Sequence, residues 1–207
     1  MQWLVLGLIV FLGVHSVRIV AEDWRQQTIE RVGPAAWKAG VSLLSALGLV
    51  LIVWGYAQAR LTPVVLWTPP LGMRHAASLL TLIAFVLLVA AYVPGNAIKA
   101  RLGHPMVLSV KLWAFAHLLA NGTLADVLLF GGFLVWAVFD YRSARRRPSP
   151  TATGADGVDE ADVDEAATEP RAGRLSATVA AVVVGVAAWA VFAFWAHGAW
   201  IGVRPFG

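Results

Sequence analysis

The stretch Gln2–Ala21, QWLVLGLIVFLGVHSVRIVA, decides the fold class. A helix needs about 20 consecutive and largely apolar residues to cross the hydrocarbon core of a bilayer, and this stretch supplies them. It lacks the basic start and the small-residue cleavage site of a signal peptide, and it carries His15 and Arg18. We therefore predict that it is retained as a transmembrane helix.

The composition of the whole chain supports the same interpretation. Of its 207 residues 59% are hydrophobic and 14% are charged, which lies well outside the usual composition of soluble domains. We predict an all-α fold, a polytopic transmembrane helix bundle with a five-helix core and one C-terminal helix. The five further candidate spans, of which the third is short, are Trp37–Ala59, Leu71–Val93, Pro105–Ala120, Leu124–Tyr141 and Leu175–Ala196.

Two connections between the spans have a distinctive composition. Leu61–Pro70 contains three prolines, which disfavour a continuous helix, so we expect an ordered or interfacial outer loop. Between Pro148 and Gly173 the chain is rich in Pro, Thr, Ala and acidic residues without any aromatic residue, which is typical of disorder. We therefore divide the chain into a transmembrane core (1–143), a disordered acidic cytoplasmic linker (144–174) and a C-terminal helix with its tail (175–207). The linker serves either as a tether or as a docking site for a soluble partner.

Lys and Arg residues are divided unevenly between the two sides of the predicted bundle. The opposite side of the bundle has only Arg60, Arg74 and Arg204. Because cytoplasmic loops of membrane proteins carry an excess of Lys and Arg, we predict that the odd-numbered connections are cytoplasmic and that both termini lie outside. The basic residues of the odd-numbered connections are Arg18, Arg25, Arg31, Lys38, Lys99, Arg101, Arg142, Arg145, Arg146, Arg147, Arg171 and Arg174.

Several functional classes lack the residues that they need. The chain has no cysteine, which excludes disulfides, thiolate metal sites and iron–sulfur clusters. We find no Gly-rich phosphate loop, no HExxH and no Ser–His–Asp arrangement. Topology explains the net charge of +4, so we expect no nucleic-acid binding. Internal repeats of the kind found in alternating-access transporters are also missing, which leaves transport as a minor alternative.

Histidines within the spans are the strongest functional signal. An ionisable side chain in hydrocarbon costs roughly 2.5 to 3.5 kcal/mol on insertion scales and usually has a partner or a role. His117 shares one helical face with Met106, Val110, Trp113 and Asn121. A structural hydrogen bond, a metal or haem ligand and a proton relay all remain open for it. A second such histidine favours the ligand, since two neutral imidazoles across an apolar cleft can hold a haem iron.

Depth in the membrane gives one indication of which histidine faces His117. Counted from the outer surface, His117 and His75 are each about four residues deep and His15 is about thirteen. At about 1.5 Å per residue, His15 would lie on the order of 13 Å further inward. Depth alone therefore favours His75 as the partner of His117.

His104 and Arg18 are candidates for binding an anionic group. Gly103 and Pro105 place His104 at the N-cap of a helix, where exposed amides and a partial positive charge suit a propionate or phosphate. Arg18 lies near the cytoplasmic end of the first span, either as an anion clamp or as a charge that reaches the membrane interface.

A set of motifs connects this chain with a known family. The motifs are FLGVHSVR at Phe11–Arg18, VWGY at Val53–Tyr56, LWTPP at Leu66–Pro70, GHPM at Gly103–Met106, KLWAFAHLLANG at Lys111–Gly122 and HGAWIG at His197–Gly202. In these the chain resembles the NnrU family over nearly its whole length outside the linker. The name of that family implies a link to nitrite and nitric oxide reductases in denitrifying bacteria.

The NnrU family is in turn similar to plant zeta-carotene isomerase, a haem b membrane enzyme. The resemblance matches a His-Ser pair, a His-Pro pair and a histidine thirteen residues later to His15-Ser16, His104-Pro105 and His117. The first and last of these are the proposed haem ligands of the isomerase, so the resemblance nominates His15 and His117 as axial ligands instead of His75. The isomerase has Arg where this chain has Gly103, which weakens the transfer of its activity.

The resemblance and the residues together give one leading hypothesis. We expect haem b between His15 and His117, its propionates bound by His104, Arg18 or neighbouring cytoplasmic basic residues, with a redox, isomerase-like or denitrification-associated role. Whether the protein is an enzyme is left open, and a lipophilic small molecule would reach the site through the lipid bilayer. The alternative is a non-catalytic assembly or maturation factor, or a transporter, for nitrite or nitric oxide reduction, with an unknown protein partner.

Overall fold

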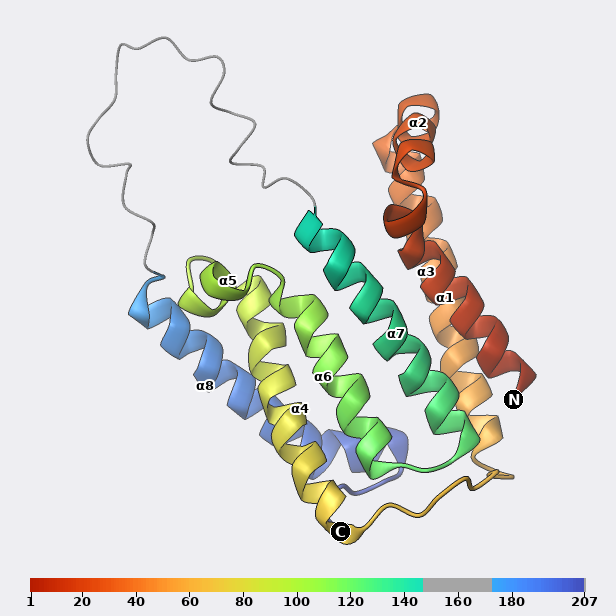
Figure 1. Cartoon of the computed structure of the whole chain (residues 1–207), viewed down its shortest axis with the longest axis vertical. Coiled ribbons are helices and arrows are strands. Elements are labelled where there is room, and N and C mark those ends of the chain that lie inside the picture. Colours follow the sequence, from red (N-terminus) through yellow and green to blue (C-terminus); the bar gives the residue numbers. More distant parts are fainter. Residues whose placement is uncertain (147–172, 207) are drawn as a thin grey trace. The chain divides into compact units, whose positions relative to one another are not determined.

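The computed structural model describes residues 1–146 and 173–206, and these residues are almost entirely helical (Figure 1). Within them the β-structure is limited to an isolated bridge between Val65 and Thr123. The prediction of an all-α fold is therefore confirmed. The elements are α1 (Gln2–Val20), α2 (Glu22–Val32), α3 (Pro34–Ala59), α4 (Leu71–Tyr92), α5 (Ala97–Leu102), α6 (Pro105–Ala120), α7 (Leu124–Arg146), α8 (Leu175–Val191) and a π-helix (Phe192–Ile201).

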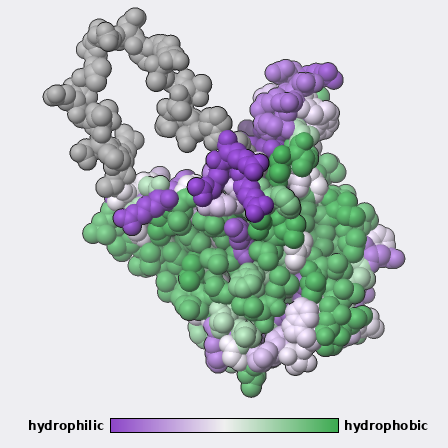
Figure 2. All heavy atoms as spheres, in the orientation of Figure 1, coloured by the Kyte–Doolittle hydropathy of each residue, from purple (hydrophilic) through white to green (hydrophobic). Residues whose placement is uncertain are grey.

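Five helices of the described residues, 19 to 27 residues long, are long and apolar enough to cross a membrane. They are α1, α3, α4, α7 and the continuous segment Leu175–Ile201, whereas the apolar helix α6 has 16 residues. Figure 2 shows hydrophobic residues along the sides of the helices and hydrophilic residues gathered at helix ends. Large apolar side chains such as Ile9 and Leu43 are 65% and 72% exposed, as expected for helices in contact with lipid.

The chain forms two compact units. The first consists of residues 1–80 and 110–140, and the second of residues 81–109 together with the chain from residue 141 onward. The sequence-based division into 1–143, 144–174 and 175–207 stays a prediction, and most of its acidic linker lies outside the described residues.

Glycines hold α1 and α3 of the first unit together (Figure 1). A Cβ atom added at Gly7 would lie 2.6 Å from the backbone nitrogen of Ile52, and one at Gly48 would lie 2.8 Å from that of Phe11. Gly55 approaches the backbone of Leu4 in the same way. Small residues let helix backbones approach closely in membranes, where dispersion contacts replace the hydrophobic effect as the source of association.

The loop between α3 and α4 is ordered against the start of α7, also in the first unit. The amides of Leu66 and Trp67 donate to the carbonyl of Gly122 at 2.8 and 3.2 Å, and the amide of Leu124 donates to Val64 at 2.9 Å. A side chain at Gly122 would collide with the carbonyl oxygen of Trp67. The loop predicted at Leu61–Pro70 is therefore ordered, and its position on the outer side stays a prediction.

Helix α8 packs specifically within the second unit. A Cβ atom at Gly185 would lie 2.6 Å from the Cα of Val86 in α4, and Trp189 Nε1 donates to Thr81 Oγ1 at 3.2 Å. At the other end of α8 the amide of Ala97 donates to Thr178 Oγ1 at 2.9 Å. The C-terminal helix is thus bonded to α4 and α5. It also continues past the expected end at Ala196 as the π-helix.

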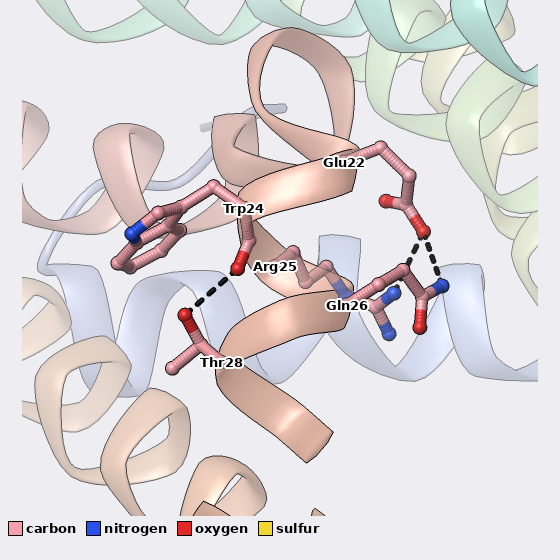
Figure 3. A network of polar contacts seen from close by, with 5 residues as sticks. All are labelled: Glu22, Trp24, Arg25, Gln26 and Thr28. Atoms are coloured by element: carbon pink, nitrogen blue, oxygen red, sulfur yellow. Dashed lines mark hydrogen bonds and ion pairs between the residues drawn. The ribbon is translucent and has the colours of Figure 1, made fainter. Parts of the chain in front are cut away.

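Helix α2 and the short helix α5 were not predicted from the sequence. Figure 3 shows polar side chains of α2 bonding to one another, with Arg25 Nη1 and Gln26 Nε2 both donating to Glu22 Oε1 at 2.8 Å. Gly33, at φ 86°, ends α2 in a conformation that other residues rarely adopt. A search for apolar spans overlooks both helices, because α2 is polar and α5 has only six residues.

The close approach of α1 and α3 predicts opposite effects for two glycine-to-alanine substitutions in α3. Gly48→Ala should lower the free energy of unfolding by about 1 to 3 kcal/mol, because the methyl group meets the Phe11 backbone. Gly40→Ala should leave it unchanged or raise it by about 0.5 to 1 kcal/mol, because Gly40 has no neighbour within 4 Å and alanine favours a helix. Unfolding by denaturing detergent measures both, and equal effects would contradict the proposed packing.

Candidate functional site

His15 and His117 both lie in the first unit, on helices that pack against α7. His15 on α1 meets Trp136 edge-on, with ring centroids 6.1 Å apart, and His117 on α6 stacks on Phe130 at 4.5 Å. On α1, Phe11 contacts Phe133 (5.7 Å) and the later His15 contacts the later Trp136, so α1 and α7 run parallel. On α6, Trp113 contacts Phe133 (5.6 Å) and the later His117 contacts the earlier Phe130, so α6 and α7 run antiparallel. The two histidines therefore stand on antiparallel helices against a common third helix.

Each imidazole is fixed by the same local hydrogen bond. His15 Nδ1 lies 2.7 Å from the carbonyl oxygen of Phe11, and His117 Nδ1 lies 2.8 Å from that of Trp113. A carbonyl oxygen can only accept, so Nδ1 must be the protonated nitrogen in both rings. In the neutral imidazole this leaves the lone pair on Nε2, the nitrogen that can bind a metal.

The two histidines are arranged symmetrically about Phe133. Each follows an aromatic residue of its own helix by four positions, and these aromatic residues, Phe11 and Trp113, are the two that contact Phe133. Phe130 and Trp136, which contact the histidines, are six residues apart, or about 9 Å along α7. Side chains of a helix point towards its N-terminus, so on antiparallel helices the two rings lean towards each other.

The other histidine weighed for this site, His75, is placed differently. It lies in the first turns of α4 and is exposed, and it makes no hydrogen bond or ring contact with any residue that the structure describes. The structure therefore brings His15, and not His75, into the aromatic cluster that contains His117.

The two predicted anion-binding residues fall in different units. Arg18 lies in the last turn of α1, three residues after His15, and is exposed. His104 belongs to the second unit, where its carbonyl accepts from the amide of Leu108 at 3.3 Å and its ring meets Tyr141 edge-on at 6.3 Å. His104 thus occupies the N-cap of α6, as Gly103 and Pro105 predict.

A buried carboxylate in the first unit is a feature that the sequence analysis did not include in the site. Asp126 is 4% exposed and accepts from Tyr56 Oη at 2.5 Å and from Thr123 at its amide (3.0 Å) and Oγ1 (2.6 Å). The ring of Tyr56 also meets Phe130 edge-on at 6.4 Å. The sequence contained one signal, the capping pattern of a Thr followed three residues later by an acidic residue before an apolar run.

The indole of Trp136 is the second feature that the sequence did not indicate. Its Nε1 is buried and has no hydrogen-bond acceptor among the described residues. From the sequence, tryptophans near helix ends indicate only anchors at the membrane interface.

The chemistry of the cluster fits an axial pair rather than a polydentate metal site. Within the described part of the chain there is no group of three or more His, Cys, Asp or Glu side chains that could hold a metal ion. A haem iron needs at most two protein ligands, because the macrocycle supplies the other four. Two histidines whose Nδ1 atoms face backbone carbonyls, among aromatic rings and beside a buried indole N–H without acceptor, offer two Nε2 atoms of that kind.

Comparison with known proteins identifies a family that matches the chain. The family described as NnrU protein matches residues 3–205, which is nearly the entire chain. No curated protein and no solved structure matches the chain.

The hydrogen bonds to the carbonyls predict the tautomer of both histidines. In ¹⁵N-histidine-labelled protein in detergent, without added ligand, His15 and His117 should each show a protonated Nδ1 and an unprotonated Nε2. Exposed His75, which has no carbonyl partner in the described residues, should show a mixture of tautomers. A protonated Nε2 at His15 or His117 in the neutral ring would contradict the geometry.

Proposed function

This chain belongs to the NnrU family, and we propose that it is an integral membrane protein that binds haem b through His15 and His117. The observation that carries the proposal is the shared hydrogen bond from Nδ1 to the carbonyl four residues earlier. Histidines that bind a metal through Nε2 almost always donate their other N–H to a carbonyl or carboxylate, which fixes the ring and raises its basicity. His15 and His117 both have this hydrogen bond within the protein alone.

The surroundings of the pair support a flat, apolar macrocycle. Phe11 stacks on His15 at 4.3 Å, and Phe130 stacks on His117 at 4.5 Å. Trp113 and Phe133 connect these two stacks through ring contacts of 5.1 to 5.7 Å. Such rings would provide the dry, polarisable walls that determine solvent access and the reduction potential of a haem.

The role that we propose for this haem is a redox or isomerase-like one on a lipophilic molecule. When bound, haem supplies an iron that changes between two oxidation states at a potential set by its axial ligands. His15 and His117 would hold the iron, the aromatic rings would exclude water, and Arg18 would bind an anionic group of the macrocycle. The substrate enters from the bilayer, in agreement with the exposed apolar surfaces of the helices.

Location and biological context complete the proposal. The excess of basic residues in the odd-numbered connections supports an inner membrane protein with both termini in the periplasm. The family resemblance supports a role associated with denitrification. A chain that does not bind haem would instead agree with a non-catalytic assembly or maturation factor for nitrite or nitric oxide reduction.

The haem proposal predicts an absorption spectrum and its response to three substitutions. Protein purified in detergent from haem-replete cells should show a Soret band and a pyridine haemochrome of b type. His15→Ala and His117→Ala should each weaken haem binding by more than about tenfold, because each removes an axial ligand. His75→Ala is the matched control and should leave the spectrum unchanged, since His75 lies outside the aromatic cluster.

Two outcomes would contradict the proposal. Wild-type protein without a Soret band would exclude haem binding. A loss of haem in His75→Ala but not in His15→Ala would show that depth in the membrane, rather than the aromatic cluster, selects the ligand.

A further inference from the structure

Trp136 contains a buried hydrogen-bond donor without a partner. Its Nε1 is buried, and no acceptor lies within reach among the residues that the structure describes. Trp189, by contrast, donates its Nε1 to Thr81 Oγ1 at 3.2 Å. The two indoles show that this protein satisfies one buried N–H internally and leaves the other unsatisfied.

An indole N–H without an acceptor is costly in an apolar environment. The great majority of buried polar groups in proteins are hydrogen-bonded, and Trp usually finds a partner for its N–H when it is buried. Phe or Leu would fill the same space without that cost. The unsatisfied donor therefore indicates an acceptor supplied from outside the described residues.

The position of Trp136 identifies the kind of molecule that supplies the acceptor. Its ring lies 6.1 Å from the ring of His15 at an interplanar angle of 89°. His15 uses Nδ1 for the Phe11 carbonyl, and its Nε2 has no hydrogen bond within the described residues. A donor without acceptor and an imidazole nitrogen with a lone pair thus stand side by side on the parallel helices α7 and α1.

Haem b offers one kind of hydrogen-bond acceptor at its edge. Its substituents are methyl and vinyl groups apart from two propionates, so an indole N–H beside an axial histidine can donate only to a propionate carboxylate. Arg18 follows His15 by three residues, towards the C-terminal end of α1. Trp136 likewise follows Phe133 towards the C-terminal end of α7, and the two helices run parallel. A cationic side chain and an N–H donor are therefore both found on the side of His15 that faces the C-terminal ends of α1 and α7.

We propose that Trp136 donates a hydrogen bond from Nε1 to a propionate carboxylate of the haem that His15 binds. This inference rests on the proposed function and extends it, because it adds a residue that would bind a propionate. Arg18, three residues after His15 on α1, would add a positive charge for the same group.

Comparing haem with its dimethyl ester tests the proposal. Both are titrated into haem-free wild-type, Trp136→Phe and Trp189→Phe protein in detergent, and binding is followed at the Soret band. Trp136→Phe should weaken binding of haem by about 5- to 100-fold, since a charge-assisted hydrogen bond is lost. Binding of the ester, which has no charged carboxylate, should change by no more than about twofold, and Trp189→Phe should affect neither ligand.

The outcomes separate the possible failures. If Trp136→Phe weakens the binding of haem and of the ester equally, the cause is lost packing. That result would overturn the role of Trp136 while leaving the haem proposal intact. Wild-type protein that binds neither ligand would overturn the proposed function and the inference together. A second measurement does not depend on affinity: resonance Raman bands of propionate bending should shift in Trp136→Phe at full occupancy, and unchanged bands would reject the hydrogen bond.

Discussion

The absence of water from the hydrocarbon core is the constraint on which the rest of this structure depends. Each polar group in a span needs a hydrogen-bond partner, because an unsatisfied group costs several kcal/mol there. Ser16 and Ser45 each donate to the carbonyl four residues earlier at 2.7 Å, and His15 and His117 use the same carbonyl position. Serine and histidine side chains in the spans thus satisfy a polar group by the same hydrogen bond to a backbone carbonyl. In the two histidines this bond also sets the tautomer and leaves the lone pair on Nε2.

The same constraint explains how much of the fold could be predicted from one sequence. Spans such as Gln2–Val20 and Pro34–Ala59 are recognisable because lipid requires a long apolar helix and nothing else. Helix α2 follows no such rule, since its residues bond to one another at the end of a span and bury nothing. The packing at Gly185 and Gly48 was also invisible, because a glycine in a span does not reveal which helix approaches it.

The candidate site was accessible from sequence only where a residue type is unusual in lipid. A histidine within a span stands out, and family resemblance then selected His15 over His75. Trp136 did not stand out, because tryptophan is common in membrane proteins and its N–H counts only when its surroundings are known. The bond from Tyr56 to Asp126 joins residues 70 positions apart, which no local pattern in a single chain can reveal.

The glycine contacts between α1 and α3 also bear on the order in which the protein is made. These two helices are complete once residue 59 has been synthesised, and their backbones fit together without any later part of the chain. His117 and Trp136 emerge from the ribosome long afterwards. We therefore expect a preformed hairpin to display His15 towards the lipid during biogenesis, so that the histidine pair is completed only when α6 and α7 arrive. Binding of the haem proposed above would then be a late event in synthesis.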